Sequence, residues 1–273
     1  MSKPNVPLID LQEASKDKDQ LKLLDSACRD HGFFLLKNHG MQDEINNMWS
    51  MSEWFFAQQR EDKLKLLRSE EIPLGFYDRE LTKQKRDLKE VFDFMETRSE
   101  QDINQWPDEP LFRETMESFF KKSSEVAKET LDLILLCLGI SKNDLIFGDS
   151  KTSNARLNFY PVDDPLSLLE KNEVNGLGDM ALHHHTDPGI LTLLLQDMTG
   201  GLQAKSKEFG WIDITPEKDS IVVNLGDAMQ VWTNDNYVAA IHRVSKRTSE
   251  PRYSTPFFYN PTSDSIIQPL SII

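Results

Sequence analysis

Three consecutive histidines end at His185, Asp187 follows two residues later, and a distant His242 lies in a later apolar run. On an extended segment, residues two apart project to the same side, so we expect His185 and Asp187 to share a face. Two imidazoles and one carboxylate leave positions open on a metal ion, and this ligand set is typical of iron(II) sites that react with dioxygen. Alone, a His-x-Asp pair is a weak signal, because a triple histidine is also compatible with a solvated loop.

A second cluster strengthens the first. Arg252 and Ser254 are two residues apart in another short apolar run, so on a strand they face the same way. A guanidinium fork beside a hydroxyl is a good receptor for a carboxylate. An iron(II) ion, the Asp187 carboxylate, a dicarboxylate oxo-acid and the Arg252 guanidinium sum to zero charge, so a buried site of this composition avoids most of the cost of isolated charge.

The composition limits the kinds of partner. The 273 residues include 31 Lys+Arg and 45 Asp+Glu, so the formal charge is −14. This balance argues against binding to nucleic acid or to an anionic membrane surface, both of which need a basic face. Cys28 and Cys137 lie in separate expected helices without a CxxC pattern, which favours reduced thiols. Because the sequence has no signal-peptide pattern and no membrane-spanning stretch, we expect a cytoplasmic protein. We also expect a monomer whose partner is a small molecule.

The apolar pattern predicts a chain of mixed α and β structure in which helices precede a β-rich half. We expect a strand at 6–11, a helix at 18–31, a buried strand at 32–36, a helix at 43–67, an irregular charged stretch at 70–108 and a long helix at 111–138. Short apolar runs then alternate with turn signals at 154–160, 190–195, 201–204, 221–224, 228–232, 239–244 and 253–259. This spacing favours an antiparallel sandwich or barrel.

The chain divides into three expected parts that form one compact body. Residues 1–110 are an N-terminal region of helices and strands that packs on the core, and residues 111–150 supply a long supporting helix. Residues 151–273 are the β-rich core that carries the histidine, aspartate and arginine clusters.

In these motifs the sequence resembles the isopenicillin-N-synthase-like branch of the iron(II)/2-oxoglutarate-dependent dioxygenases. The similar segments of the N-terminal region are 6–10, 27–34 and 38–40. Those of the β-rich half are 156–161, 185–187, 191–194, 196–197, 201–203, 223–227, 242–244 and 252–254. Because the segments occur in this order over nearly the whole chain, their combination is highly specific.

The resemblance implies a fold and a ligand set. The fold is a double-stranded β-helix, a distorted jelly roll, with N-terminal and flanking helices around it. Iron(II) is implied on His185, Asp187 and His242, and the distal carboxylate of 2-oxoglutarate on Arg252 and Ser254. The implied reaction uses O2, with ascorbate as a possible reductant, and oxidises a substrate C–H bond while releasing succinate and CO2. Hydroxylation is the default outcome, and desaturation or oxidative cyclisation are the others.

Further residues receive expected roles with less support from the sequence. The resemblance implies that Asn158 and Tyr160 orient the co-substrate. The aromatic residues that we name for the substrate pocket are Phe159, Phe258, Tyr77 and Phe92, although core packing explains each of them equally well. His183 and His184 match no role in the family, and His31 and His39 are expected to be structural or at the surface. Asn224, Gly226 and Asp227 are interpreted as turn residues inside the β-core.

Two alternatives stay open. A non-haem iron oxidase of the same fold that does not use 2-oxoglutarate, similar to isopenicillin N synthase or the ethylene-forming oxidase, also carries an Arg-x-Ser pair; the pair of Asn158 and Tyr160 favours the 2-oxoglutarate users. A non-catalytic jelly-roll binding protein is the other alternative, and the complete set of three metal ligands argues against it. Family members commonly continue past the Arg-x-Ser strand with a helical tail, so the chain's stop at Ile273 predicts a substrate entrance that is more open or is completed by another segment.

Overall fold

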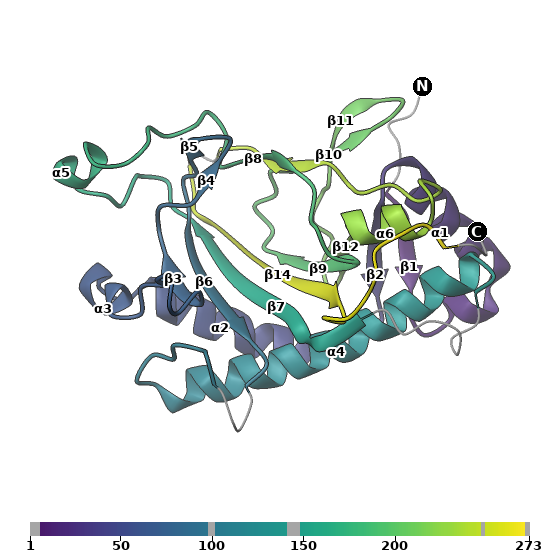
Figure 1. The fold of residues 1–273 in the computed structure, drawn as a ribbon, viewed down its shortest axis with the longest axis horizontal. Coiled ribbons are helices and arrows are strands. Elements are labelled where there is room, and N and C mark those ends of the chain that lie inside the picture. The colour runs from purple at the N-terminus through teal and green to yellow at the C-terminus, as the bar shows by residue number, and fades with distance from the viewer. Residues whose placement is uncertain (1–5, 98–101, 141–147, 247–248, 271–273) are drawn as a thin grey trace.

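The structure is a computed structural model that describes residues 6–97, 102–140, 148–246 and 249–270. Two β-sheets in the described residues face each other, and helices cover the outer side of the larger one (Figure 1). The large sheet has the spatial order β1 (Leu8–Asp10), β2 (Phe33–Lys37), β12 (Ile221–Leu225), β9 (Leu191–Gln196), β14 (Arg252–Pro261), β7 (Gly148–Tyr160), β6 (Glu90–Met95) and β3 (Gly75–Tyr77). Its pairs are antiparallel except for β1 and β2.

The smaller elements complete the layers. The second sheet has the order β11 (Gly210–Asp213), β10 (Leu202–Ser206), β13 (His242–Val244) and β8 (Leu182–His185), and β4 (Leu81–Thr82) pairs with β5 (Lys85–Arg86) as a hairpin. The helices are α1 (Lys18–Asp30), α2 (Gln42–Phe56), α3 (Arg60–Leu64), α4 (Pro110–Cys137), α5 (Leu168–Lys171) and α6 (Asp227–Trp232), with a 3-10 turn at Ala14–Lys16. No helix of the described ranges is long and apolar enough to cross a membrane.

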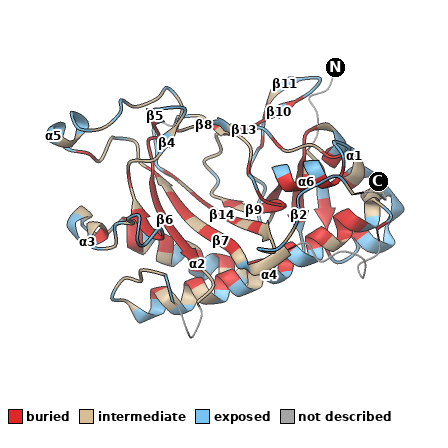
Figure 2. Ribbon diagram, in the orientation of Figure 1, coloured by how far each residue is buried: buried red, intermediate tan, exposed pale blue. Residues whose placement is uncertain are grey.

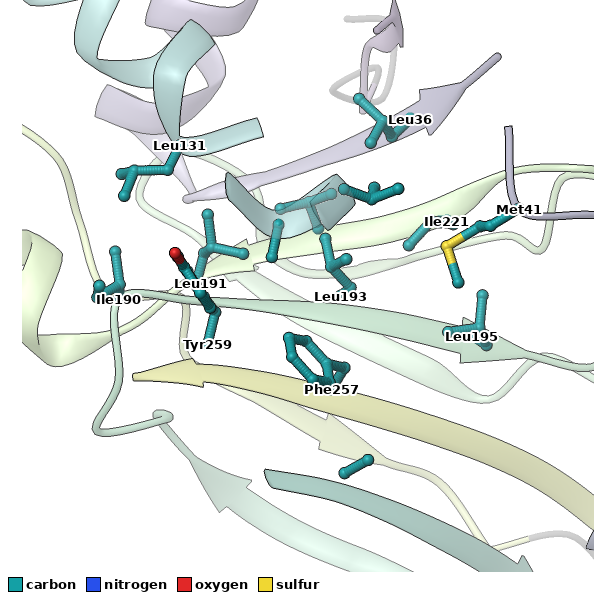
Figure 3. Packing of buried hydrophobic residues seen from close by; sticks show 14 of the residues in the cluster. Leu36, Met41, Leu131, Ile190, Leu191, Leu193, Leu195, Ile221, Phe257 and Tyr259 are labelled. Atoms are coloured by element: carbon teal, nitrogen blue, oxygen red, sulfur yellow. The ribbon is translucent and has the colours of Figure 1, made fainter. Parts of the chain in front are cut away.

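The main core lies between the large sheet and the helices. α4 starts with Pro110 in its first turn, after Glu109 accepts a hydrogen bond from the backbone N–H of Leu111. Its buried stripe packs against the outer face of the sheet, where Phe120 meets Phe257 of β14 edge to face at 5.0 Å between ring centroids. Figure 2 shows the buried colour along the strands and on one side of α4, and Figure 3 shows the leucines of β9 beside Phe257.

Strand alternation separates this core from the space between the sheets. On β14, Phe257 and Tyr259 point into the helix-covered core, whereas Arg252, Ser254 and Phe258 line a cavity on the inner face. A second buried cluster, which includes Phe33, joins inner positions of both sheets. The alternation therefore directs one set of apolar side chains outward to the helices, whereas the inner face carries both the polar residues of the cavity and a smaller apolar cluster.

Three of the expected elements were wrong. The stretch 70–108 contains β3, β4, β5 and β6, because ion pairs across the strands satisfy the charged positions that looked irregular. The run 228–232 is part of helix α6, since a short apolar run does not distinguish a strand from a helix. The helix expected at 43–67 is divided into α2 and α3. Strands from residues 1–110 pair with strands from the β-rich half in one sheet. The three expected parts are therefore segments of the sequence, and the sheet is shared between them.

Candidate active site

The three expected metal ligands come together between the two sheets. The register of β8 and β13 places His242 opposite His185, and Asp187 follows two residues after the end of β8. Asp187 Oδ1 lies 3.7 Å from His185 Nε2 and 3.9 Å from His242 Nε2. One ligand atom from each of the three residues lies within 4.8 Å of the others, which fits a single metal ion. Two imidazoles and a carboxylate on one side are the donor set suited to iron(II).

Hydrogen bonds orient both imidazoles. His185 Nδ1 is 2.9 Å from the carbonyl oxygen of His183, and His242 Nδ1 is 2.8 Å from that of Ala240. A carbonyl only accepts, so each Nδ1 carries the proton and each Nε2 presents its lone pair toward Asp187. This arrangement is the usual one for histidines that bind a metal.

Two residues from neighbouring strands hold Asp187. Its Oδ2 atom accepts hydrogen bonds from Thr192 Oγ1 at 2.6 Å and from Asn224 Nδ2 at 2.8 Å, which leaves Oδ1 for the metal. Thr192 on β9 and Asn224 on β12 are direct partners in the sheet register. The interpretation of Asn224 as a turn residue was wrong, because it lies inside a buried strand and its side chain contacts the proposed ligand.

The protonation states suit metal binding. Burial, with a further contribution from the charge of His242, lowers the pKa of His185 to about 4, so its imidazole is neutral at pH 7. Burial alone raises the pKa of Asp187, but His242, the hydrogen bond from Thr192 and His185 outweigh it, and the net pKa is lowered. A neutral imidazole and an ionised carboxylate are the forms that bind a metal ion.

Arg252 is a fully buried cation whose hydrogen-bond partners are neutral. Its guanidinium donates to the Gly200 carbonyl at 2.9 Å, to Ser254 Oγ at 3.0 Å and to Gln196 Oε1 at 3.4 Å. Within the described ranges no carboxylate forms an ion pair with it. A buried positive charge without an anionic partner is costly, so the geometry suits an incoming carboxylate.

Asn158 and Tyr160 lie beside this arginine on the neighbouring strand. The register pairs Arg252 with Tyr160 and Ser254 with Asn158. The guanidinium carbon is 5.0 Å from the centre of the Tyr160 ring. Asn158 Oδ1 is buried and has no hydrogen-bond partner in the described part of the chain, so it faces the cavity as an unused acceptor.

One cavity of about 350 Å³ connects these groups. The expected site residues on its wall are His185, Asp187, His242, Arg252, Ser254, Asn158, Tyr160 and Phe258. The expected residues that the structure places elsewhere are Phe159, Phe92 and Tyr77. Phe159 stacks on Phe56 on the opposite face of the sheet, Phe92 is fully buried in the aromatic core, and Tyr77 lies against the guanidinium of Arg68. Strand alternation explains the position of Phe159, because its neighbours Asn158 and Tyr160 both point into the cavity.

The other histidines lie apart from the three ligands. His183 contacts Asp179 at 3.0 Å and lies 3.6 Å from Asp87, and His184 contacts Lys83. His31 and His39 are buried and accept hydrogen bonds from nearby backbone N–H groups.

Sequence reasoning missed several polar residues of the cavity, namely Thr192, Asn224, Glu80, Lys89 and Arg156. A single polar residue within an apolar strand was the available signal for the first two. Glu80, Lys89 and Arg156 are charged, and they reach the cavity because distant segments pair in the sheet. No local pattern in the sequence indicates that pairing.

Comparisons with known proteins agree with this geometry. Residues 152–261 match the 2OG-Fe(II) oxygenase superfamily, and residues 6–109 match the N-terminal region named for the non-haem dioxygenase in morphine synthesis. 1-Aminocyclopropane-1-carboxylate oxidase 4 of Solanum lycopersicum is 33% identical over 97% of this chain and 82% of its own length. Protein DMR6-LIKE OXYGENASE 1 of Arabidopsis thaliana is 29% identical over 97% and 75%.

Solved structures share the whole fold. A full-length Neurospora crassa protein crystallised in complex with alpha-KG superposes with a TM-score of 0.81 at 29% identity, covering 98% of this chain and 88% of that one. JOX2 in complex with 2OG, Fe and JA gives a TM-score of 0.80 at 25% identity, covering 98% and 78%. The expected mixed α and β fold with a distorted jelly-roll core is thereby confirmed. The chain belongs to the 2OG-Fe(II) oxygenase superfamily and is a non-haem iron(II)/2-oxoglutarate oxygenase family enzyme.

Proposed function

We propose that the chain hydroxylates a small molecule, with iron(II) on His185, Asp187 and His242 and 2-oxoglutarate on Arg252 and Ser254. The observation that carries the proposal is one cavity that joins the three ligands to a buried guanidinium, and that guanidinium has no anionic partner among the described residues. With O2, the bound iron and 2-oxoglutarate supply the oxidising chemistry that breaks the substrate C–H bond and yields succinate and CO2.

The residues of this chain bind and orient the reactants. Arg252 and Ser254 hold the distal carboxylate, and Tyr160 closes one side of that end of the cavity. The two negative charges of a dicarboxylate cancel the net positive charge of iron(II), Asp187 and Arg252 together, so the filled site is neutral. The hydrogen bonds that His185 and His242 donate to backbone carbonyls, and the one that Asp187 accepts from Thr192, orient the metal-binding atoms before the metal binds, which reduces the reorganisation that binding requires.

The test is succinate formation by protein supplied with iron(II), ascorbate and 2-oxoglutarate, in the presence and absence of metabolite mixtures. We expect a mixture that contains the substrate to stimulate succinate release. His185→Ala should abolish iron binding, while His183→Ala serves as the matched control and should retain it. If only the His183 variant lost iron binding, His183 and not His185 would be the ligand, and the assignment of His185 would be wrong.

A second candidate is a same-fold oxidase that does not use 2-oxoglutarate. The 33% identity to a 1-aminocyclopropane-1-carboxylate oxidase favours it. The likeness to the Neurospora crassa protein in complex with alpha-KG, together with the available Arg252, favours the first candidate. Calorimetry distinguishes them, because an iron-loaded protein without affinity for 2-oxoglutarate would support the second candidate.

A further inference from the structure

Glu80, Lys89 and Arg156 on the cavity wall belong to a network of buried and half-buried charges. Glu80 lies at its centre, with Oε2 at 3.1 Å from Lys89 Nζ and 2.8 Å from Arg156 and with Oε1 at 2.6 Å from Arg68. Burial alone favours the protonated form of Glu80, but these three cations lower its pKa well below the ordinary value. Asp93 joins the same network through paired contacts to Arg156.

The charges of this network balance. Its cations are Arg68, Lys89 and Arg156, and its carboxylates are Glu80, Asp87 and Asp93. The network therefore has no net charge, in contrast to the surroundings of Arg252. An incoming carboxylate would find each cation already neutralised and would lie near carboxylates of its own sign.

Lys89 nevertheless retains hydrogen-bonding capacity toward the cavity. Its side chain is only 3% exposed and lines the cavity that also contains the metal ligands. An ammonium group has three N–H donors, whereas the carboxylates near it in the described residues are Glu80 at 3.1 Å and Asp87 at 4.0 Å. Glu80 engages this nitrogen from one side, and the N–H donors that remain suit an acceptor atom of a bound molecule.

We propose that Lys89 is a substrate-specificity residue, and that it donates to a carbonyl oxygen of a small neutral substrate. This inference rests on the proposed function, since it concerns the molecule that the enzyme oxidises. Asn158 Oδ1 has no hydrogen-bond partner among the described residues, and in this proposal it accepts from an N–H of the substrate instead of orienting the co-substrate. Phe258 supplies an apolar surface on the cavity wall. The class that combines these features is a neutral amide, lactam or imide that carries an apolar C–H group.

The experiment measures binding to protein loaded with iron(II) and 2-oxoglutarate without oxygen, so that no turnover occurs. Thymine and 2-piperidone are the neutral carbonyl probes, and 1-aminocyclopropane-1-carboxylate and cyclohexanecarboxylate are the carboxylate probes. We expect a neutral probe to bind at least about tenfold more tightly than either carboxylate. Lys89→Met should weaken that probe by about 10- to 100-fold, the usual effect of losing a hydrogen bond from a charged group.

Lys85→Met is the matched control, because Lys85 is exposed on the β4–β5 hairpin. It should leave the binding of every probe unchanged. Glu80→Gln gives the network a net positive charge and should shift the preference toward the carboxylate probes. Affinity for 2-oxoglutarate should stay unchanged in both lysine variants, which shows that they are folded.

Several results would overturn the proposal. A wild-type protein that binds the carboxylate probes more tightly than the neutral ones would contradict it. So would a wild-type protein that binds 2-oxoglutarate normally but neither neutral probe. Unchanged affinity for neutral probes in the Lys89 variant would remove that residue from recognition. A wild-type protein that does not bind iron or 2-oxoglutarate would instead contradict the proposed function.

Discussion

Thr192→Val should weaken iron(II) binding although Thr192 is not a proposed ligand. The hydroxyl donates to Asp187 Oδ2 at 2.6 Å and, with Asn224, keeps the other carboxylate oxygen directed at the two histidines. Valine has nearly the same shape but lacks the donor. The substitution therefore removes one of two hydrogen bonds that orient the carboxylate and leaves the packing of β9 almost unchanged.

The size of the effect follows from burial. The Asp187 side chain is 7% exposed, so water does not replace the lost donor easily. A hydrogen bond to a charged group contributes about 1.5–3 kcal/mol. Loss of a residue that orients a metal ligand typically lowers metal affinity by about 10- to 100-fold, which corresponds to about 1.4–2.8 kcal/mol. We therefore expect the dissociation constant for iron(II) to rise by about one to two orders of magnitude.

Anaerobic calorimetry with iron(II) is the assay. Thr130→Val is the matched control, because Thr130 is also buried but donates to the Val126 carbonyl within α4, far along the chain from the site. The control should keep the wild-type iron affinity. If Thr192→Val binds iron as tightly as the wild type, or if the control loses affinity equally, then the orientation of Asp187 by Thr192 does not determine metal binding and the reasoning is refuted.

Three further predictions concern other contacts. Arg252→Gln should weaken 2-oxoglutarate binding by about 2–5 kcal/mol in calorimetry, because it removes one side of a buried charge pair, and unchanged affinity would exclude Arg252 from the site. Lys63→Met should lower the free energy of unfolding in urea by about 3–5 kcal/mol, since it leaves Glu90, now 2.5 Å from Lys63 Nζ, buried without a partner; a double variant with Glu90→Leu should regain most of that loss. Hydrogen bonds from Ser167 and the charge of Arg60 lower the pKa of Glu170 to about 2. Its stabilising contribution is therefore complete above the ordinary pKa of 4.5 and disappears as the pH falls toward 2, so the stability advantage of the wild type over Glu170→Gln should vanish over that interval.

The sequence was sufficient to predict the parts of the site that depend on short spacing. A separation of two residues on a strand predicts a shared face, and Arg252 and Ser254 do point into one cavity. The same rule, applied to Phe159, would have placed it on the opposite face from Asn158 and Tyr160. Phe159 was therefore a poor choice for the substrate pocket on grounds that the sequence already contained.

The remaining parts depend on pairing between distant segments. Thr192 and Asn224 meet at Asp187 because β9 and β12 are neighbours in a particular register, and no local pattern specifies that register. Lys89 belongs to a stretch whose charges indicated an irregular segment. Only the pairing of β6 with β7 shows that Asp93 lies opposite Arg156, so that opposite charges meet inside the molecule.

These contacts suggest how one cavity distinguishes two ligands. Arg252 and Lys89 are both buried cations on its wall, but Arg252 has neutral hydrogen-bond partners and Lys89 has Glu80 at 3.1 Å. A dicarboxylate is therefore attracted to Arg252, where its charge is needed, and gains little at Lys89, where the charge is already balanced. On this reasoning Glu80 and Asp87 help to orient both 2-oxoglutarate and the substrate. They balance the charge of Lys89, while its N–H groups can still donate hydrogen bonds.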